Sequence, residues 1–167
     1  MELTKYERLN LINQYKILEK LYPEEANDYK LLRTALEEGY VLNYNDSFHW
    51  MEEELSKENC REVLDILNMY RTLTFSYRDL NDKGNINESD VIFPGFDGNH
   101  ETGQYVYAKY YIFDLDRYHE LHDKIQYPDF NSHRGMLNKY RRMLSVYNQL
   151  NDKHSLNAEE IRNVLEA

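Results

Sequence analysis

Residues that interrupt helices are scarce in this sequence, and their scarcity constrains the fold more than any other feature. The 167 residues include only three prolines, Pro23, Pro94 and Pro128, and six glycines. Between them, apolar side chains recur at the three- and four-residue spacing that is typical of amphipathic helices. The pattern predicts an all-α, multihelical single domain over residues 1–167, with about six to seven helices.

The first two predicted helices meet at Pro23. Thr4 and Glu7 have the spacing of a capping box, and apolar residues then recur at helical spacing over residues 11–22. A second helix is predicted from about residue 24 to Gly39, because glycine favours the left-handed conformation just after a helix end.

The middle of the sequence predicts a short helix, a long helix and an irregular segment. The short helix is expected around residues 48–55, and Ser56 is a suitable N-cap for the longest helix, about 57–80. Residues 81–100 hold Pro94 and several glycines, which predict an irregular central loop. This loop is also the boundary of an alternative division into sub-lobes 1–80 and 101–167.

Three further helices are predicted in the C-terminal part. Residues 105–113 are rich in Tyr, Val, Ile and Phe, which favour strands, but the absence of strict alternation favours a buried helix. Helical spacing of apolar residues predicts another helix over 134–150, and Ser155 or Asn157 is the expected N-cap of the last one.

Several separated strings along nearly the whole chain match one protein family. They are Arg8-Leu9, Asn13-Gln14-Tyr15-Lys16, Gly39-Tyr40, Cys60-Arg61, Asp65-Ile66, Met69-Tyr70, Gly95-Phe96-Asp97, Lys139-Tyr140 and Arg142-Met143-Leu144. In their order and spacing the sequence resembles the YfbU family of bacterial proteins, whose function is uncharacterised. The resemblance implies an all-helical fold in the cytoplasm, assembled as a homo-oligomer. It implies no reaction and no catalytic residue.

Residues 79–90 have the length and composition of a calcium-binding loop. Oxygen-bearing side chains and Gly84 fall near their places in such a loop. However, Lys83 puts an ammonium group at a ligand position, and Asp90 replaces the usual bidentate glutamate. Because Asn, Asp and Gly are also common in surface turns, we favour an ordinary loop here.

Three further features are the candidates for an enzyme or a metal-binding protein. His119, His122 and Asp123 have a spacing that could place two imidazoles and a carboxylate on one helical face, although exposed histidines beside acids are common. Cys60 lies near a helix N-terminus and beside Arg61, a setting typical of nucleophilic cysteines, although buried cysteines are commoner. Asp97 follows Gly95-Phe96. Sequence motifs of the common hydrolases and nucleotide-binding folds are absent, and we predict no catalytic residue, metal or cofactor.

Charge is unevenly distributed along a chain whose net charge is −10. Residues 24–58 hold ten acids and three bases, whereas residues 131–151 hold no acid and four bases, Arg134, Lys139, Arg141 and Arg142. These four cations are the candidate contacts for a partner or an anion. Patches of opposite charge steer protein association, while the overall negative charge repels nucleic acid.

These observations favour a non-enzymatic helical protein that self-associates and acts through protein–protein contacts. Sixteen tyrosines support this interpretation, because tyrosine is enriched at interfaces. A single cysteine, the lack of a signal peptide and the lack of a long apolar run favour the cytoplasm over a membrane or an oxidising compartment. The alternatives are a nucleic-acid-associated regulatory module that uses the basic helix 134–150, and an enzyme or metal-binding protein of unrecognised type.

Overall fold

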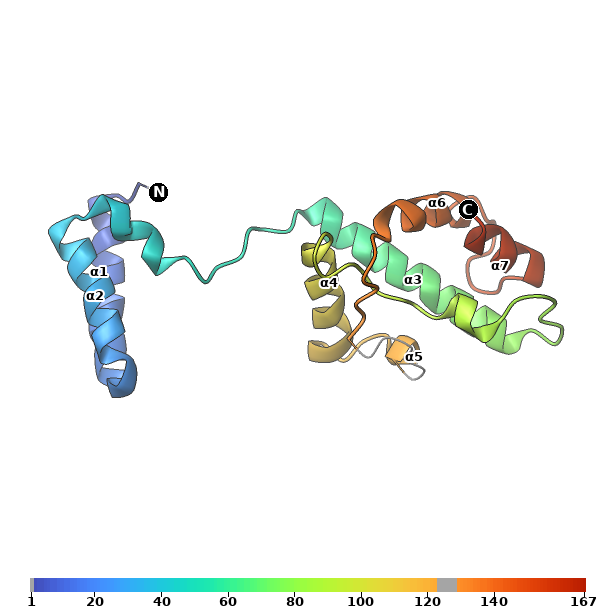
Figure 1. Ribbon diagram of the computed structural model, residues 1–167, viewed down its shortest axis with the longest axis horizontal. Coiled ribbons are helices and arrows are strands. Elements are labelled where there is room, and N and C mark those ends of the chain that lie inside the picture. Colours follow the sequence, from blue (N-terminus) through green and yellow to red (C-terminus); the bar gives the residue numbers. More distant parts are fainter. Residues whose placement is uncertain (1, 123–128) are drawn as a thin grey trace. The chain divides into compact units, whose positions relative to one another are not determined.

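The computed structural model describes residues 2–122 and 129–167, and in these residues the protein is helical without any β-strand (Figure 1). The predicted all-α, multihelical class is therefore confirmed. One isolated parallel β-bridge, Phe96 to Asn131, accompanies the helices. The chain forms two compact units, unit 1 at Met1–Glu54 and unit 2 at Leu55–Ala167.

Unit 1 is a helical hairpin with a short 3-10 helix on either side of its second helix. It contains α1 (Lys5–Leu21), η1 (Pro23–Glu25), α2 (Ala26–Glu38) and η2 (Val41–Ser47). The Thr4–Glu7 capping box is present, and Gly39 ends α2 in the left-handed conformation, so both predicted helix boundaries are confirmed. α1 and α2 lie side by side (Figure 1).

A small core and one arginine hold the hairpin together. The buried members of the core are Tyr15, Leu36 and Tyr44, with partly buried side chains around them. The Arg8 guanidinium donates to the carbonyl oxygens of Leu36 and Glu37. It therefore satisfies acceptors that the C-terminus of α2 would otherwise leave without a donor.

The prediction of a helix over residues 48–55 is wrong. A turn follows η2, and residues 52–56 have no regular structure. Trp50 and Met51 are both exposed, so no apolar contact stabilises a helix there, and short helices depend on such packing.

Unit 2 is built around the long helix α3 (Lys57–Asp79). The other elements are η3 (Glu88–Val91), α4 (Thr102–Lys109), the π-helical segment η4 (Tyr110–Asp114), α5 (His119–His122), α6 (Leu137–Tyr147) and α7 (Ala158–Leu165). α3 contacts η3, α4, α5, α6 and α7. Ser56 caps α3, and a capping box at Asn157 begins α7. These caps confirm the predicted long helix and the Asn157 start. The helix predicted over residues 105–113 is present as α4, which begins earlier at Thr102, and the π-helical segment that follows it.

Aromatic rings from distant parts of the sequence fill the core of unit 2. Tyr70 of α3, Phe93, Phe96, Phe130 and Tyr140 of α6 are all buried and in mutual ring contact. Residues 81–100, the boundary in the alternative division into sub-lobes, therefore lie inside unit 2, because their phenylalanines pack between α3 and α6. The loop is irregular, as predicted.

Candidate functional site

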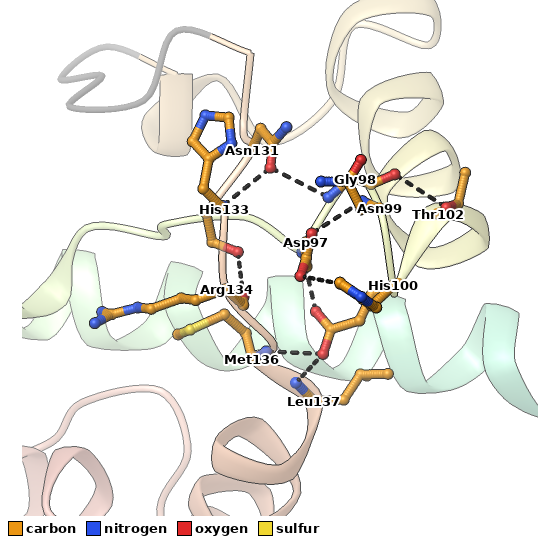
Figure 2. Close-up of polar contacts among 12 residues, drawn as sticks. Asp97, Gly98, Asn99, His100, Thr102, Asn131, His133, Arg134, Met136 and Leu137 are labelled. Carbon is orange, nitrogen blue, oxygen red and sulfur yellow. Dashed lines mark hydrogen bonds and ion pairs between the residues drawn. The ribbon is translucent and has the colours of Figure 1, made fainter.

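Two irregular segments cross in unit 2 and are joined by a group of polar contacts (Figure 2). We call residues 95–102 and 130–137 the polar crossing. Phe96 N–H donates to the Phe130 carbonyl at 3.1 Å, and Ser132 N–H donates to the Phe96 carbonyl at 3.0 Å. This pair of bonds is the isolated β-bridge, and it fixes the register of the two segments.

Gly95 allows the two segments to approach each other. Its φ is +90°, and a Cβ at this position would lie 1.7 Å from the Phe130 carbonyl oxygen. The Gly95 carbonyl also accepts a hydrogen bond of 2.6 Å from the buried Tyr140 hydroxyl. Only glycine fits both the backbone conformation and the space.

Asp97 is a buried carboxylate at the start of α4. Its oxygens accept from Asn99 N–H at 2.9 Å and from His100 Nδ1 at 2.8 Å. The backbone bond from Asn99, followed by the bond from His100, lowers the pKa of Asp97 below its ordinary value. Asp97 therefore organises the turn that begins α4.

Glu101 joins the two segments through three backbone donors. One carboxylate oxygen accepts from Met136 N–H at 2.7 Å and Leu137 N–H at 2.8 Å, and the other accepts from Asp97 N–H at 3.0 Å. Glu101 is only 7% exposed. Because Met136 stands at the N-cap of α6 and its side chain makes no capping hydrogen bond, Glu101 caps α6 from a distance.

Asn131 completes the crossing from the other segment. Its Oδ1 accepts from Gly98 N–H at 3.1 Å and from His133 N–H at 3.0 Å. Two residues near it, Phe130 and His133, have φ of +56° and +52°, which is unfavourable for residues other than glycine. The hydrogen bonds of the crossing hold this backbone in place.

The chemistry of the crossing is that of a scaffold. An Asp–His pair such as Asp97–His100 can orient an imidazole as a base, and the His100 side chain is 82% exposed. Yet the nearby hydroxyls are engaged with backbone carbonyls, Thr102 with Gly98 and Ser132 with Arg134. Apart from the Asp97–His100 pair, the hydrogen bonds of Glu101, Asn131, Thr102 and Ser132 join these side chains to the protein's own backbone.

The four predicted contact cations do not form one patch. Arg141 pairs with Glu62 through two bonds of 2.7 and 2.9 Å, and Arg142 donates to the Asn138 carbonyl. Along α6, Lys139 and Arg142 are three residues apart and share one side, whereas Arg141 lies on another. Arg134 precedes the helix and is exposed.

The predicted metal-binding candidates have other partners. The ammonium of Lys83 donates to the carbonyls of Tyr77 and Leu80, and Asp90 caps η3. His119 pairs with Asp116, and His122 packs on the ring of Phe113. Asp123, the third member of that predicted cluster, lies outside the described residues.

Cys60 is partly buried, and its thiol lies 3.7 Å from the Leu55 carbonyl. Within residues 2–122 and 129–167, no three His, Cys, Asp or Glu side chains are grouped so that they could hold a metal ion. In the same ranges, no helix has both the length and the apolar character to cross a membrane.

Exposed apolar side chains are concentrated in unit 1. Sixteen large apolar residues of the described chain are exposed, and eleven of them belong to this smaller unit. These eleven are Tyr6, Leu9, Ile17, Leu21, Tyr22, Leu31, Tyr40, Val41, Leu42, Trp50 and Met51. Unit 1 therefore exposes more large apolar side chains than unit 2, although it is the smaller of the two.

Sequence reasoning identified Asp97 but not its role, and it missed Glu101, Asn131 and the apolar surface of unit 1. The Glu101 and Asn131 contacts join residues more than thirty positions apart, for which a single sequence carries no local signal. The exposed apolar residues of α1 do carry a local signal, because they repeat at helical spacing next to the apolar residues of α1 that pack in the core.

The comparison with known families covers the whole chain. The model of the YfbU domain matches residues 1–167.

Proposed function

The chain belongs to the YfbU family, and from that premise we propose that it is a non-enzymatic cytoplasmic protein that self-associates and acts through protein–protein contacts. The observation that carries the proposal is the apolar surface of unit 1, where eleven large apolar side chains are exposed. The acidic segment 24–58 and the basic helix α6 add surfaces of opposite charge, which steer and orient such contacts.

The size of the core of unit 1 supports this proposal. Only three large side chains are buried in its core cluster, and small domains bury too little surface to be stable without additional contacts. The exposed side chains therefore represent a source of binding free energy, at roughly 25 cal/mol for each Å² that a partner covers.

The charge of the protein favours a protein partner over nucleic acid. Arg141 is already paired with Glu62, which leaves fewer cations of α6 for phosphate groups. With a net charge of −10, the protein would repel a polyanion. We therefore place Arg134, Lys139 and Arg142 at a contact with an acidic protein surface rather than with nucleic acid.

Sedimentation equilibrium of the full chain across the micromolar range tests the proposal. We expect a reversible, concentration-dependent increase in mass above that of the monomer. Fluorescence anisotropy with mixed RNA and DNA at low salt should show no binding. A purely monomeric protein at every concentration, or nucleic-acid binding that Arg134→Ala and Arg142→Ala abolish, would contradict it.

A further inference from the structure

We propose that two copies of this chain associate through one face of α1, with the contact centred on Asn13. We call the exposed apolar side chains Tyr6, Leu9, Ile17 and Leu21 the outer face of α1. This inference rests on the proposed self-association and identifies the surface that would produce it.

The outer face follows the helix as two apolar pairs, Tyr6 with Leu9 and Ile17 with Leu21, on either side of Asn13. At about 100° per residue, its four members fall within an arc of about 120° around the axis of α1. Asn13 lies on the same arc, midway between Leu9 and Ile17, and is exposed.

The opposite side of α1 is already occupied. Leu11, Ile12, Tyr15 and Leu18 pack in the core of the hairpin. α1 therefore has two apolar faces, and only one of them is covered within unit 1. A helix that is apolar on both sides is one that is covered on both sides.

The outer face is large enough for a contact between two copies. Tyr6, Leu9, Ile17 and Leu21 are 72%, 53%, 58% and 64% exposed. Covering these side chains on two copies would bury on the order of 1,000 Å², which is the size at which specific protein interfaces begin. Tyrosine at the end of the stripe is also typical of interfaces.

The charges around α1 favour a second copy as the occupant. Two identical surfaces can meet only where like charges do not face each other, and this chain carries thirty acids. The arc of the outer face contains no acid, and its one charged residue is the exposed Lys20. A two-fold contact centred on Asn13 places Lys20 opposite Tyr6 and not opposite a second lysine. The two acids of α1 have partners within unit 1, Glu7 in the capping box at Thr4 and Glu19 in an ion pair with Arg33 at 2.5 Å.

The other apolar surfaces fit a second copy less well. The depression between α2 and η2 is lined by Leu31 and Tyr40 but also by Asp46, so joining two copies there would bring acids together. In unit 2, the stripe on α4 and η4 has three members in place of four, and two of them, Tyr110 and Phe113, are 44% and 40% exposed, less than any member of the outer face.

A charge placed on the outer face tests the proposal. Ile17→Glu puts one carboxylate from each copy into the contact, and we expect the dimer Kd from sedimentation to rise about a hundredfold or more. Asn27→Glu is the matched control, because it adds the same charge at an exposed position of α2 and should leave the Kd unchanged. Because unit 1 depends on this contact, circular dichroism should show some loss of helicity with Ile17→Glu and none with Asn27→Glu, whereas the unfolding of unit 2 in urea should be the same in both variants.

The outcomes separate this inference from the proposed function. A monomeric wild-type protein would overturn both. An oligomeric wild type whose Kd is unchanged by Ile17→Glu would leave self-association standing and overturn the assignment to α1.

A cross-link provides a second test that does not depend on destabilising the contact. In a Cys60→Ser background, Asn13→Cys should form a disulfide between copies on mild oxidation, because the contact places the two positions opposite each other. Asn27→Cys in the same background should remain uncross-linked. A dimer that forms with Asn13→Cys but does not cross-link, or cross-links equally at both positions, would contradict the proposal.

Discussion

The two units of this protein use their apolar residues in opposite ways. Unit 2 encloses them in a core of twenty-three buried residues, among which five aromatic rings pack against one another. Unit 1 encloses three in its core cluster and exposes eleven large ones. Both units are helical and both carry well-formed caps, so the difference lies in packing and not in secondary structure.

This difference shows that well-capped helices can form in a unit whose core buries too little apolar surface to stabilise it alone. Unit 1 has a capping box, a left-handed glycine at Gly39 and an arginine that satisfies the end of α2. These features stabilise the helices themselves by about 1 kcal/mol each. They do not replace the free energy gained from buried surface. The stability of unit 1 therefore depends on another surface that covers its exposed apolar side chains, whereas unit 2 is stabilised by its own core and by the polar crossing.

The largest expected effect is on the two units expressed separately. Residues 55–167 should unfold cooperatively in urea, because their core is complete. Residues 1–54 should show weak helicity and no cooperative transition, because ordering each residue costs about 1–2 kcal/mol and few side chains are buried in return. Circular dichroism during urea titration measures both, and a cooperative transition of the 1–54 fragment at low concentration would remove the contrast between the units.

Within unit 2, Gly95→Ala should destabilise the protein more than any other single substitution in the polar crossing. The new Cβ would lie 1.7 Å from the Phe130 carbonyl oxygen, so the β-bridge cannot form, and we expect a loss of more than about 4 kcal/mol in the free energy of unfolding. Gly135→Ala is the matched control, since its nearest neighbour, Glu101 Oε1, is at an ordinary 3.6 Å. Similar urea midpoints for the two variants would contradict the role given to Gly95.

A smaller loss is expected when the Glu101 carboxylate becomes an amide. Glu101→Gln keeps the size of the side chain but turns one acceptor oxygen into an NH2 group facing backbone N–H donors, which should cost about 2–4 kcal/mol. Glu58→Gln, at an exposed position of α3, should change the urea midpoint little. If Glu101→Gln is as stable as the wild type, the cap on α6 is not supplied by this residue.

The smallest effect concerns the dependence of stability on pH. The pKa of Asp97 is lowered in the folded protein from the ordinary 3.8, so its stabilisation is complete above the unfolded pKa and is lost as pH falls through the folded one. Asp97→Asn should therefore be less stable than the wild type at neutral pH and should lose less stability on acidification. Urea midpoints measured from neutral to acid pH would show parallel curves if Asp97 made no contribution.

The helices could be predicted where their signals are local. Thr4 with Glu7, Gly39, Ser56 and Asn157 each fix a boundary through residues within four positions. The prediction failed over residues 48–55, where the exposed Trp50 and Met51 have no partner to pack against. Propensity alone does not form a helix of that length.

The polar crossing could not be predicted because it is defined by residues that meet only in the folded chain. Asp97 was noticed for its neighbours Gly95 and Phe96, but its bonds to Asn99 and His100 make it a turn-forming residue. The four basic residues of the 134–142 region were identified as a group from their charge, and only the structure shows that Arg141 is already bound to Glu62. Charge counts along a sequence do not reveal such pairing.

The distant cap on α6 also has a consequence for the order in which the chain acquires its structure. Met136 and Leu137 obtain their acceptor from a residue at least thirty-five positions earlier, so the first turn of α6 gains this bond only after a long loop has closed. The capping boxes of α1 and α7 need no such closure. We expect hydrogen exchange during refolding to protect the amides of α7 before those at the start of α6, because only the latter wait for the contact with Glu101.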